Sequence, residues 1–181
     1  ETITLPMGKA RIDMDFGQYL ENLENKLRSS FDVYRDHTLG NKKYDLFAKY
    51  YIRTERYILT KKTKVYGLEN NEYILLKYFG SMDLESLNEF KETLISSIGH
   101  VVDPHGEHMS SIITGVVVTD LPLTVISDQV ADSARKFKYH KGFSFGLKGW
   151  VDVRLLIVSL KDGIVISNRK GREVEKVYLI S

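Results

Sequence analysis

The sequence contains no cysteine, only three prolines among 181 residues, and no apolar run long enough to cross a bilayer. The lack of cysteine excludes a disulfide scaffold, a cysteine zinc finger and a thiol enzyme. No basic stretch followed by an apolar segment opens the chain, so we expect no secretory signal. A hydrophobic content of 43% and a net charge of +2 argue against general disorder. A soluble cytoplasmic protein with a substantial core is therefore expected.

The hydrophobic period indicates where helices form. Residues 1–13 show no clear period and are predicted to be an N-terminal tail, whereas residues 14–181 are predicted to form a single domain. Three segments with apolar residues at steps of three and four are predicted helices. These segments are 15–27, 84–98 and 124–137. Asp15 and Gln18 should form a capping box on the first helix, and Asp83 should cap the second.

Segments rich in tyrosine and branched aliphatic residues, bounded by turn residues, are predicted strands. They cover residues 43–53, 56–66, 72–79, 112–119, 150–160, 163–167 and 173–180. Gly67 and the pair Asn70-Asn71 are interpreted as a hairpin loop between the second and third strands. The order helix, three strands, helix, strand, helix, three strands predicts an α+β fold, with a mixed, largely antiparallel sheet and three flanking helices.

Charge is distributed unevenly along the chain. Residues 42–64 carry eight basic and two acidic side chains, and residues 133–151 carry five basic side chains and no acid. Eight of the eleven tyrosines lie between Tyr34 and Tyr78. A basic face with aromatic side chains favours a polyanion such as nucleic acid, or an acidic protein. The predicted binding residues are Lys49, Arg53, Lys61, Lys62, Lys64, Lys138, Lys141 and Lys148.

The loop predicted over residues 99–110 contains three of the five histidines. Imidazole and carboxylate together suit a divalent transition metal, although the spacing matches no defined motif. If a metal binds, His105, Glu107 and His108 are the predicted ligands, because they are closest along the chain. Solvated loop side chains are the alternative, and on that interpretation the protein needs no cofactor.

Residues 141–150 are rich in glycine and aromatic residues. They lack the spacing of a phosphate-binding loop, and Ser144 has no later histidine to activate it. Phe143, Phe145 and Trp150 are therefore predicted to cover one end of the sheet. On the following strand Asp152 and Arg154 share a face with Trp150 and are predicted to pair with each other.

Several segments together resemble a family of clostridial-type bacterial proteins of unknown function. They are YILTKK at 57–62, ENNEY at 69–73, HMSS at 108–111, GVVVT at 115–119, KGWVDVR at 148–154 and residues 168–176. The resemblance covers residues 15–180 and implies no site residues. A fold-level similarity to restriction-endonuclease-like domains implies an acid-x-Lys motif on a strand, but this tripeptide occurs only at 24–26 and 89–91, both in predicted helices.

Two hypotheses follow for the function. The first is a non-catalytic binding domain whose basic, tyrosine-rich surface contacts a polyanion or an acidic partner, with no membrane involved. The alternative is a metal-dependent hydrolase, acting on phosphodiesters through the loop of His105, Glu107 and His108. The sequence leaves both hypotheses and the oligomeric state open.

Overall fold

A capping box fixes the start of the first long helix, as predicted, and the predicted cap Asp83 belongs to a second capping box. The computed structural model describes residues 14–57, 65–122 and 124–180. In α1 (Phe16–Leu27) the Asp15 carboxylate accepts the Gln18 backbone N–H at 2.8 Å, and the Gln18 side chain accepts the Asp15 N–H at 3.2 Å. Asp83 and Ser86 cap α2 (Leu84–Val101) in the same way. These side chains satisfy backbone donors that the helix leaves unpaired.

The remaining helices differ from the prediction. The third helix, α3 (Asp128–Lys136), begins four residues later than expected, because the Ser127 hydroxyl accepts the Val130 N–H and caps it there. Residues predicted as a final strand instead form α4 (Glu175–Tyr178). No helix in the described part of the chain has the length and apolar character needed to span a membrane.

The described residues contain seven strands that belong to one sheet. The strands are β1 (Asp32–Leu39), β2 (Lys42–Tyr57), β3 (Val65–Tyr78), β4 (His108–Thr119), β5 (His140–Gly142), β6 (Trp150–Ser159) and β7 (Ile164–Ser167). Their order is β1-β2-β3-β4-β6-β5, and β7 also pairs with β6. The pairs β3–β4 and β4–β6 are parallel, and the other pairs are antiparallel. The predicted mixed, largely antiparallel α+β sheet is therefore confirmed.

Two predictions for the region where β2 and β3 meet were wrong in detail. The predicted strand 56–66 covers the outer ends of β2 and β3, with residues 58–64 outside the described residues. The supposed hairpin loop at Gly67 and Asn70-Asn71 lies inside β3, where Gly67 pairs with Glu55. Strands β1 and β5 were not predicted, because both are short of buried apolar side chains. The predicted N-terminal tail lies outside the described residues.

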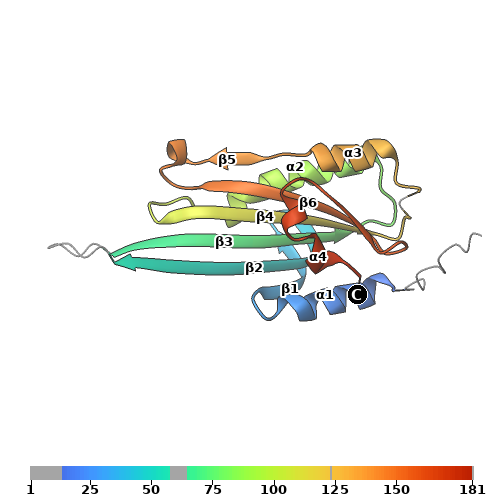
Figure 1. Cartoon of the computed structure of the whole chain (residues 1–181), viewed down its shortest axis with the longest axis horizontal. Coiled ribbons are helices and arrows are strands. Elements are labelled where there is room, and N and C mark those ends of the chain that lie inside the picture. The colour runs from blue at the N-terminus through green and yellow to red at the C-terminus, as the bar shows by residue number, and fades with distance from the viewer. Residues whose placement is uncertain (1–13, 58–64, 123, 181) are drawn as a thin grey trace, which may run out of the picture.

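Helices cover both faces of the sheet and create two apolar cores (Figure 1). Residues of α2 and α3 pack on one face, and residues of α1 with Tyr178 of α4 pack on the other. Eight apolar side chains of the predicted helices 15–27 and 84–98 and of the predicted strands 112–119 and 150–160 are at most 6% exposed. These side chains are Leu20, Leu23, Phe90, Leu94, Ile113, Val117, Leu155 and Ile157.

Candidate anion-binding site at the sheet edge

The face of the sheet that carries α1 and α4 is covered over only half of its length. Residues that lie side by side on neighbouring strands form rows across this face. The buried rows, here called the covered half, are Leu46, Leu76, Val116 and Leu156, and Ala48, Ile74, Thr114 and Arg154. The partly or fully exposed rows, here called the open half, are Tyr50, Glu72, Ile112 and Asp152, and Ile52, Asn70, Ser110 and Trp150.

The outer edge of β6 has a gap at the border between these halves. Strand β5 pairs with the first three residues of β6, and β7 pairs with residues Leu156–Ser159. On this outer side, the backbone of Val153 and Leu155 therefore has no strand beside it. Because buried backbone groups need hydrogen-bond partners, this gap has to be filled by other groups.

The Asn168 side chain fills the gap and takes the place of a strand. Its Oδ1 accepts the Leu155 N–H at 3.1 Å, and its Nδ2 donates to the Val153 carbonyl at 3.1 Å. The same amide also bonds the Phe137 carbonyl and the Gly171 N–H. Gly171 is required here, since an added Cβ would lie 2.9 Å from Ser167 and 3.0 Å from the Leu155 carbonyl oxygen. The 168–171 turn is thus held firmly against β6.

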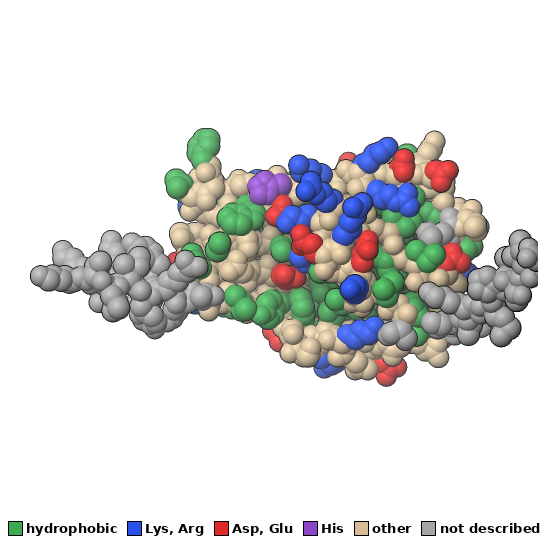
Figure 2. All heavy atoms as spheres, in the orientation of Figure 1, with side chains coloured by type: hydrophobic (Ala, Val, Ile, Leu, Met, Phe, Trp, Pro, Cys, Tyr) green, Lys and Arg blue, Asp and Glu red, His purple; other side chains and the backbone are tan. Residues whose placement is uncertain are grey.

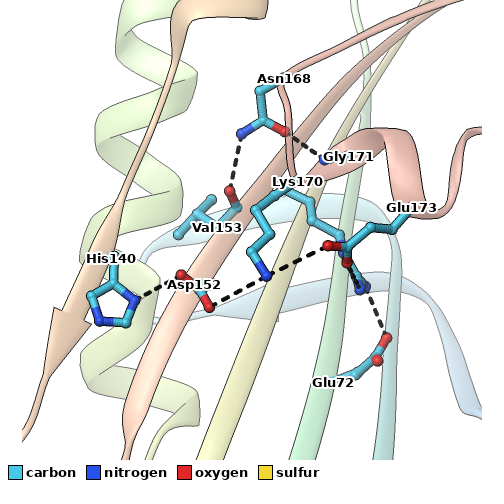
Figure 3. A network of polar contacts seen from close by, with 9 residues as sticks. Glu72, His140, Asp152, Val153, Asn168, Lys170, Gly171 and Glu173 are labelled. Carbon is cyan, nitrogen blue, oxygen red and sulfur yellow. Dashed lines mark hydrogen bonds and ion pairs between the residues drawn. The ribbon is translucent and has the colours of Figure 1, made fainter. Parts of the chain in front are cut away.

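This turn places Lys170 in a chain of ion pairs that crosses the border (Figure 3). One end of the chain is His140, whose Nδ1 lies 2.8 Å from an Asp152 oxygen, while Lys170 Nζ lies 3.9 Å from the other. Lys170 also reaches Glu173 at 3.5 Å. The predicted pair of Asp152 with Arg154 is wrong, because each of the two has other partners.

Arg154 is the buried end of the chain. Its guanidinium, 6% exposed, binds Glu72 at 3.2 Å and Glu173 at 2.9 Å. The hydrogen bond from Arg154 holds the pKa of the Glu173 carboxyl below its usual range, against a smaller opposing effect of burial. A buried guanidinium is tolerated here because two carboxylates compensate its charge.

A pocket of about 470 Å³ opens beside this chain, between the C-terminal end of α3, β6 and the 168–171 turn. Its charged lining residues are Arg135, Lys136, Lys138, Arg169, Lys170, Asp152 and Glu173. Five basic and two acidic side chains leave a net charge of +3, and basic side chains gather in this region of the surface (Figure 2).

The pairing inside this pocket leaves positive charge available to a ligand. Both acids are already paired with basic groups, and Arg135 and Lys136 share Asp132 at 3.5 and 3.2 Å. Within the described ranges, Lys138 and Arg169 have no ion pair. We call the surface formed by the pocket residues 135–138 and 168–170 the basic edge.

A second hollow, of about 530 Å³, lies between α2 and the start of β2. Its charged lining residues are Lys42, Lys43, Lys77, Glu89 and Glu92. The lysine Nζ of Lys77 donates to the Lys43 carbonyl at 3.1 Å, and Lys43 pairs with Asp36. With two acids against three lysines, this hollow holds less unbalanced positive charge than the basic edge.

Of the five predicted binding residues that the structure describes, Lys138 lines the basic edge and the other four lie elsewhere. Lys49 sits over the Tyr34 ring at 5.7 Å, and Lys141 sits over the Phe143 ring at 5.6 Å. Arg53 pairs with Glu107 at 2.9 Å. Lys148 is exposed on the loop before β6. The other three predicted lysines, Lys61, Lys62 and Lys64, lie outside the described residues.

The three predicted metal ligands are engaged in separate interactions. His105 Nε2 lies 2.8 Å from Glu69, and its Nδ1 accepts the Glu107 N–H at 3.3 Å. His108 is 4% exposed and has its two ring nitrogens at 2.7 Å from the Lys148 carbonyl and 2.9 Å from the Ser111 hydroxyl. Within the described ranges, no group of three or more histidine and acidic side chains could hold a metal ion. The metal hypothesis stays a prediction without geometric support.

The Glu69 carboxyl explains why His105 and Arg53 gather at this place. It is 9% exposed, and a hydrogen bond from Tyr51 holds its pKa below the usual range, with help from His105 and against the effect of burial. Arg53 lies 4.0 Å away. A buried carboxylate needs such partners, so this cluster has a structural explanation.

Sequence reasoning missed Arg169 and Lys170 as binding residues. The Asn168-Arg169-Lys170-Gly171 segment lies between the predicted strands 163–167 and 173–180, and its composition indicates only a turn between them. A signal was present, because two adjacent basic residues in a turn present their charges together. What the sequence could not reveal is that Asn168 fixes this turn beside Lys138, 30 residues earlier in the chain.

Fold and site together define an α+β domain in which a mixed seven-stranded sheet, covered by helices on both faces, carries a basic pocket on its edge. Comparison with known families identifies the chain further. Residues 15–180 match the family described as a domain of unknown function, DUF8052, and the chain belongs to this family. No curated protein and no solved structure matches the chain significantly.

Proposed function

We propose that this chain is a non-catalytic binding domain that holds a phosphate-bearing polyanion against its basic edge. The observation that carries the proposal is the unbalanced charge of the pocket, where Lys138 and Arg169 remain without carboxylate partners among the described residues. Each phosphate bound there releases condensed counterions, which favours binding without any need for base recognition. A cytoplasmic location, where nucleic acids and other polyanions are abundant, is part of this proposal.

The surroundings of the pocket support binding more than catalysis. Asn168 and Gly171 fix the turn that carries Arg169 and Lys170, so the backbone that presents these two charges needs little ordering when a ligand binds. The described residues that line this pocket include no serine, threonine or cysteine that could act as a nucleophile. The fold-level similarity to restriction-endonuclease-like domains adds no activity, because both acid-x-Lys tripeptides lie on helices α1 and α2.

Binding can be tested with a fluorescein-labelled single-stranded oligonucleotide of about 20 nucleotides, followed by fluorescence anisotropy, with inorganic polyphosphate as competitor. The variant Lys138→Glu/Arg169→Glu should lose most of the binding. A matched control is Lys161→Glu/Lys176→Glu, which changes the net charge equally at exposed lysines outside the pocket. Equal binding by the two variants would contradict the proposal, and so would the absence of any binding by the unaltered chain at low salt.

A further inference from the structure

The segment 143–149, which connects β5 to β6, carries two large apolar side chains that project into water. Phe145 is fully exposed and Leu147 is 81% exposed, more than any other large hydrophobic side chain in the described residues. The sequence-based expectation that Phe145 covers the sheet end is therefore wrong. Phe143 does pack against the core. The exposed pair requires an explanation, since such side chains on a surface often mark an interaction site.

The backbone of this segment is strained at its tip. Ser144 and Phe145 have φ angles of 48° and 56°, in the left-handed region that non-glycine residues rarely adopt. Hydrogen bonds close the segment, from Phe143 N–H to the Gly149 carbonyl at 2.9 Å and from Lys148 N–H to the Phe143 carbonyl at 3.1 Å. A strained backbone that persists in order to expose a large apolar side chain suggests a function for that side chain.

The base of the segment is anchored by His108. Its Nδ1 donates to the Lys148 carbonyl at 2.7 Å, and its ring packs edge-on against Phe143 with ring centroids 5.9 Å apart. Gly149, with a φ of +77°, lies so close to β4 that an added Cβ would be 2.5 Å from the Met109 carbonyl oxygen. The base is thus fixed to β4, and the tip alone is free to contact a partner.

In the sequence, the charged residues that flank this segment are all basic. Residues 133–151 contain no acid, and Lys141 and Lys148 are exposed on either side of the two apolar side chains. The segment follows β5, which pairs with β6 on the same outer side as the 168–171 turn of the basic edge. Figure 1 shows β5 and α3 along one border of the molecule. Apolar side chains at a projecting tip, with lysines behind them, match the layered chemistry of a membrane interface.

We infer that the 143–149 segment inserts Phe145 and Leu147 into the interface of an anionic lipid bilayer, while Lys141 and Lys148 contact lipid phosphates. The inference rests on the proposed function in one respect, because the basic edge would supply part of the attraction to the anionic bilayer. A lipid surface accommodates a convex apolar tip without a preformed groove. Single-stranded nucleic acid fits less well, because Leu147 has no ring on which a base could stack.

The test is co-sedimentation with vesicles of phosphatidylcholine alone or with about one third phosphatidylserine, at physiological salt. We expect binding to the anionic vesicles. Phe145→Ser/Leu147→Ser should weaken it at least about tenfold, and Phe145→Leu should preserve it. In the variant Lys141→Gln/Lys148→Gln, each lysine replaced should lower the affinity for anionic vesicles about fivefold. The control Val125→Ser/Ile164→Ser removes exposed apolar side chains at the opposite end of the sheet and should bind normally.

A second readout does not depend on the serine variants folding well. Trp150 is the sole tryptophan, so Phe145→Trp combined with Trp150→Phe places one fluorophore at the tip. Its emission should shift to the blue with anionic vesicles. Vesicle binding without this shift, or equal binding by the serine variant, would overturn the insertion. Binding to the oligonucleotide but not to vesicles would overturn the membrane inference and leave the proposed function intact. Binding to neither would contradict both the inference and the proposed function.

Discussion

The covered and open halves of one sheet face are built from the same four strands and yet differ in composition and in exposure to solvent. In the covered half, aliphatic side chains such as Leu76 and Val116 are fully buried beneath α1 and α4. Four residues earlier on the same strands, Glu72 and Ile112 are partly exposed. Because a strand keeps its period of two, both sets of side chains point to the same face of the sheet, and their difference in exposure follows from what covers them. One half therefore stabilises the fold, and the other half leaves its side chains free for other roles.

Arg154 marks the border between the halves. It belongs to a buried row, but its carboxylate partners Glu72 and Glu173 lie on the exposed side. The basic edge lies at the same border, next to the gap that Asn168 fills. A site at the margin of a core can combine rigid support with access to solvent, which is what a preorganised binding site needs.

The largest contrast between the halves should be in stability. Leu76→Ala removes a side chain that is 0% exposed in the covered half and should lower the free energy of unfolding by about 3–5 kcal/mol. Ile52→Ala, at a 41% exposed position of the open half, should cost less than about 1 kcal/mol. Urea unfolding followed by circular dichroism measures both. Similar losses would show that the open half is packed in solution.

The next contrast compares two asparagines. Asn168→Ala leaves four backbone groups without their side-chain partners, and should cost about 2–4 kcal/mol. Asn70 in the open half accepts one hydrogen bond, from the Ser110 hydroxyl at 2.7 Å. Asn70→Ala should therefore cost less than about 1 kcal/mol. If the two variants unfold at the same urea concentration, Asn168 does not act as a substitute for a strand.

A smaller effect concerns pH. The pKa of Glu173 is lowered in the folded state by the hydrogen bond from Arg154, so its ionised form contributes stability above the unfolded pKa of about 4.3. This contribution is lost as the pH falls through the lower folded pKa. Glu173→Gln should flatten the fall of stability below about pH 5, whereas Glu21→Gln on the exposed face of α1 should not. Urea midpoints between about pH 3 and 7 measure this, and an unchanged slope in Glu173→Gln would show that the pair is weak.

Much of the fold could be predicted from local sequence signals. The caps at Asp15 and Asp83 and the apolar periods behind them placed α1 and α2, and the apolar run at 112–119 placed most of β4. The failures occurred where tertiary contacts decide. Gly67 and Asn70 are typical of turns, but both lie within β3, because Gly67 pairs with β2 and Asn70 pairs with both β2 and β4.

The C-terminal helix shows the same limit. Residues 173–180 alternate well enough for a strand, but Val174 and Tyr178 are four apart and both pack against the covered half. A short segment satisfies either period, and the available core surface selects the helix. The candidate site was predicted only in part, through Lys138, because the position of the 168–171 turn depends on contacts across the sheet.

The central claim, that the basic edge binds a polyanion through charge, is tested most directly by the salt dependence of oligonucleotide binding. The logarithm of the association constant should fall linearly with the logarithm of salt concentration, by roughly 0.7–0.9 for each phosphate neutralised. Lys138→Ala/Arg169→Ala should reduce this slope by the amount expected for about two phosphates. The reduction should be the same for all base sequences. A slope identical to that of the unaltered chain would contradict the account.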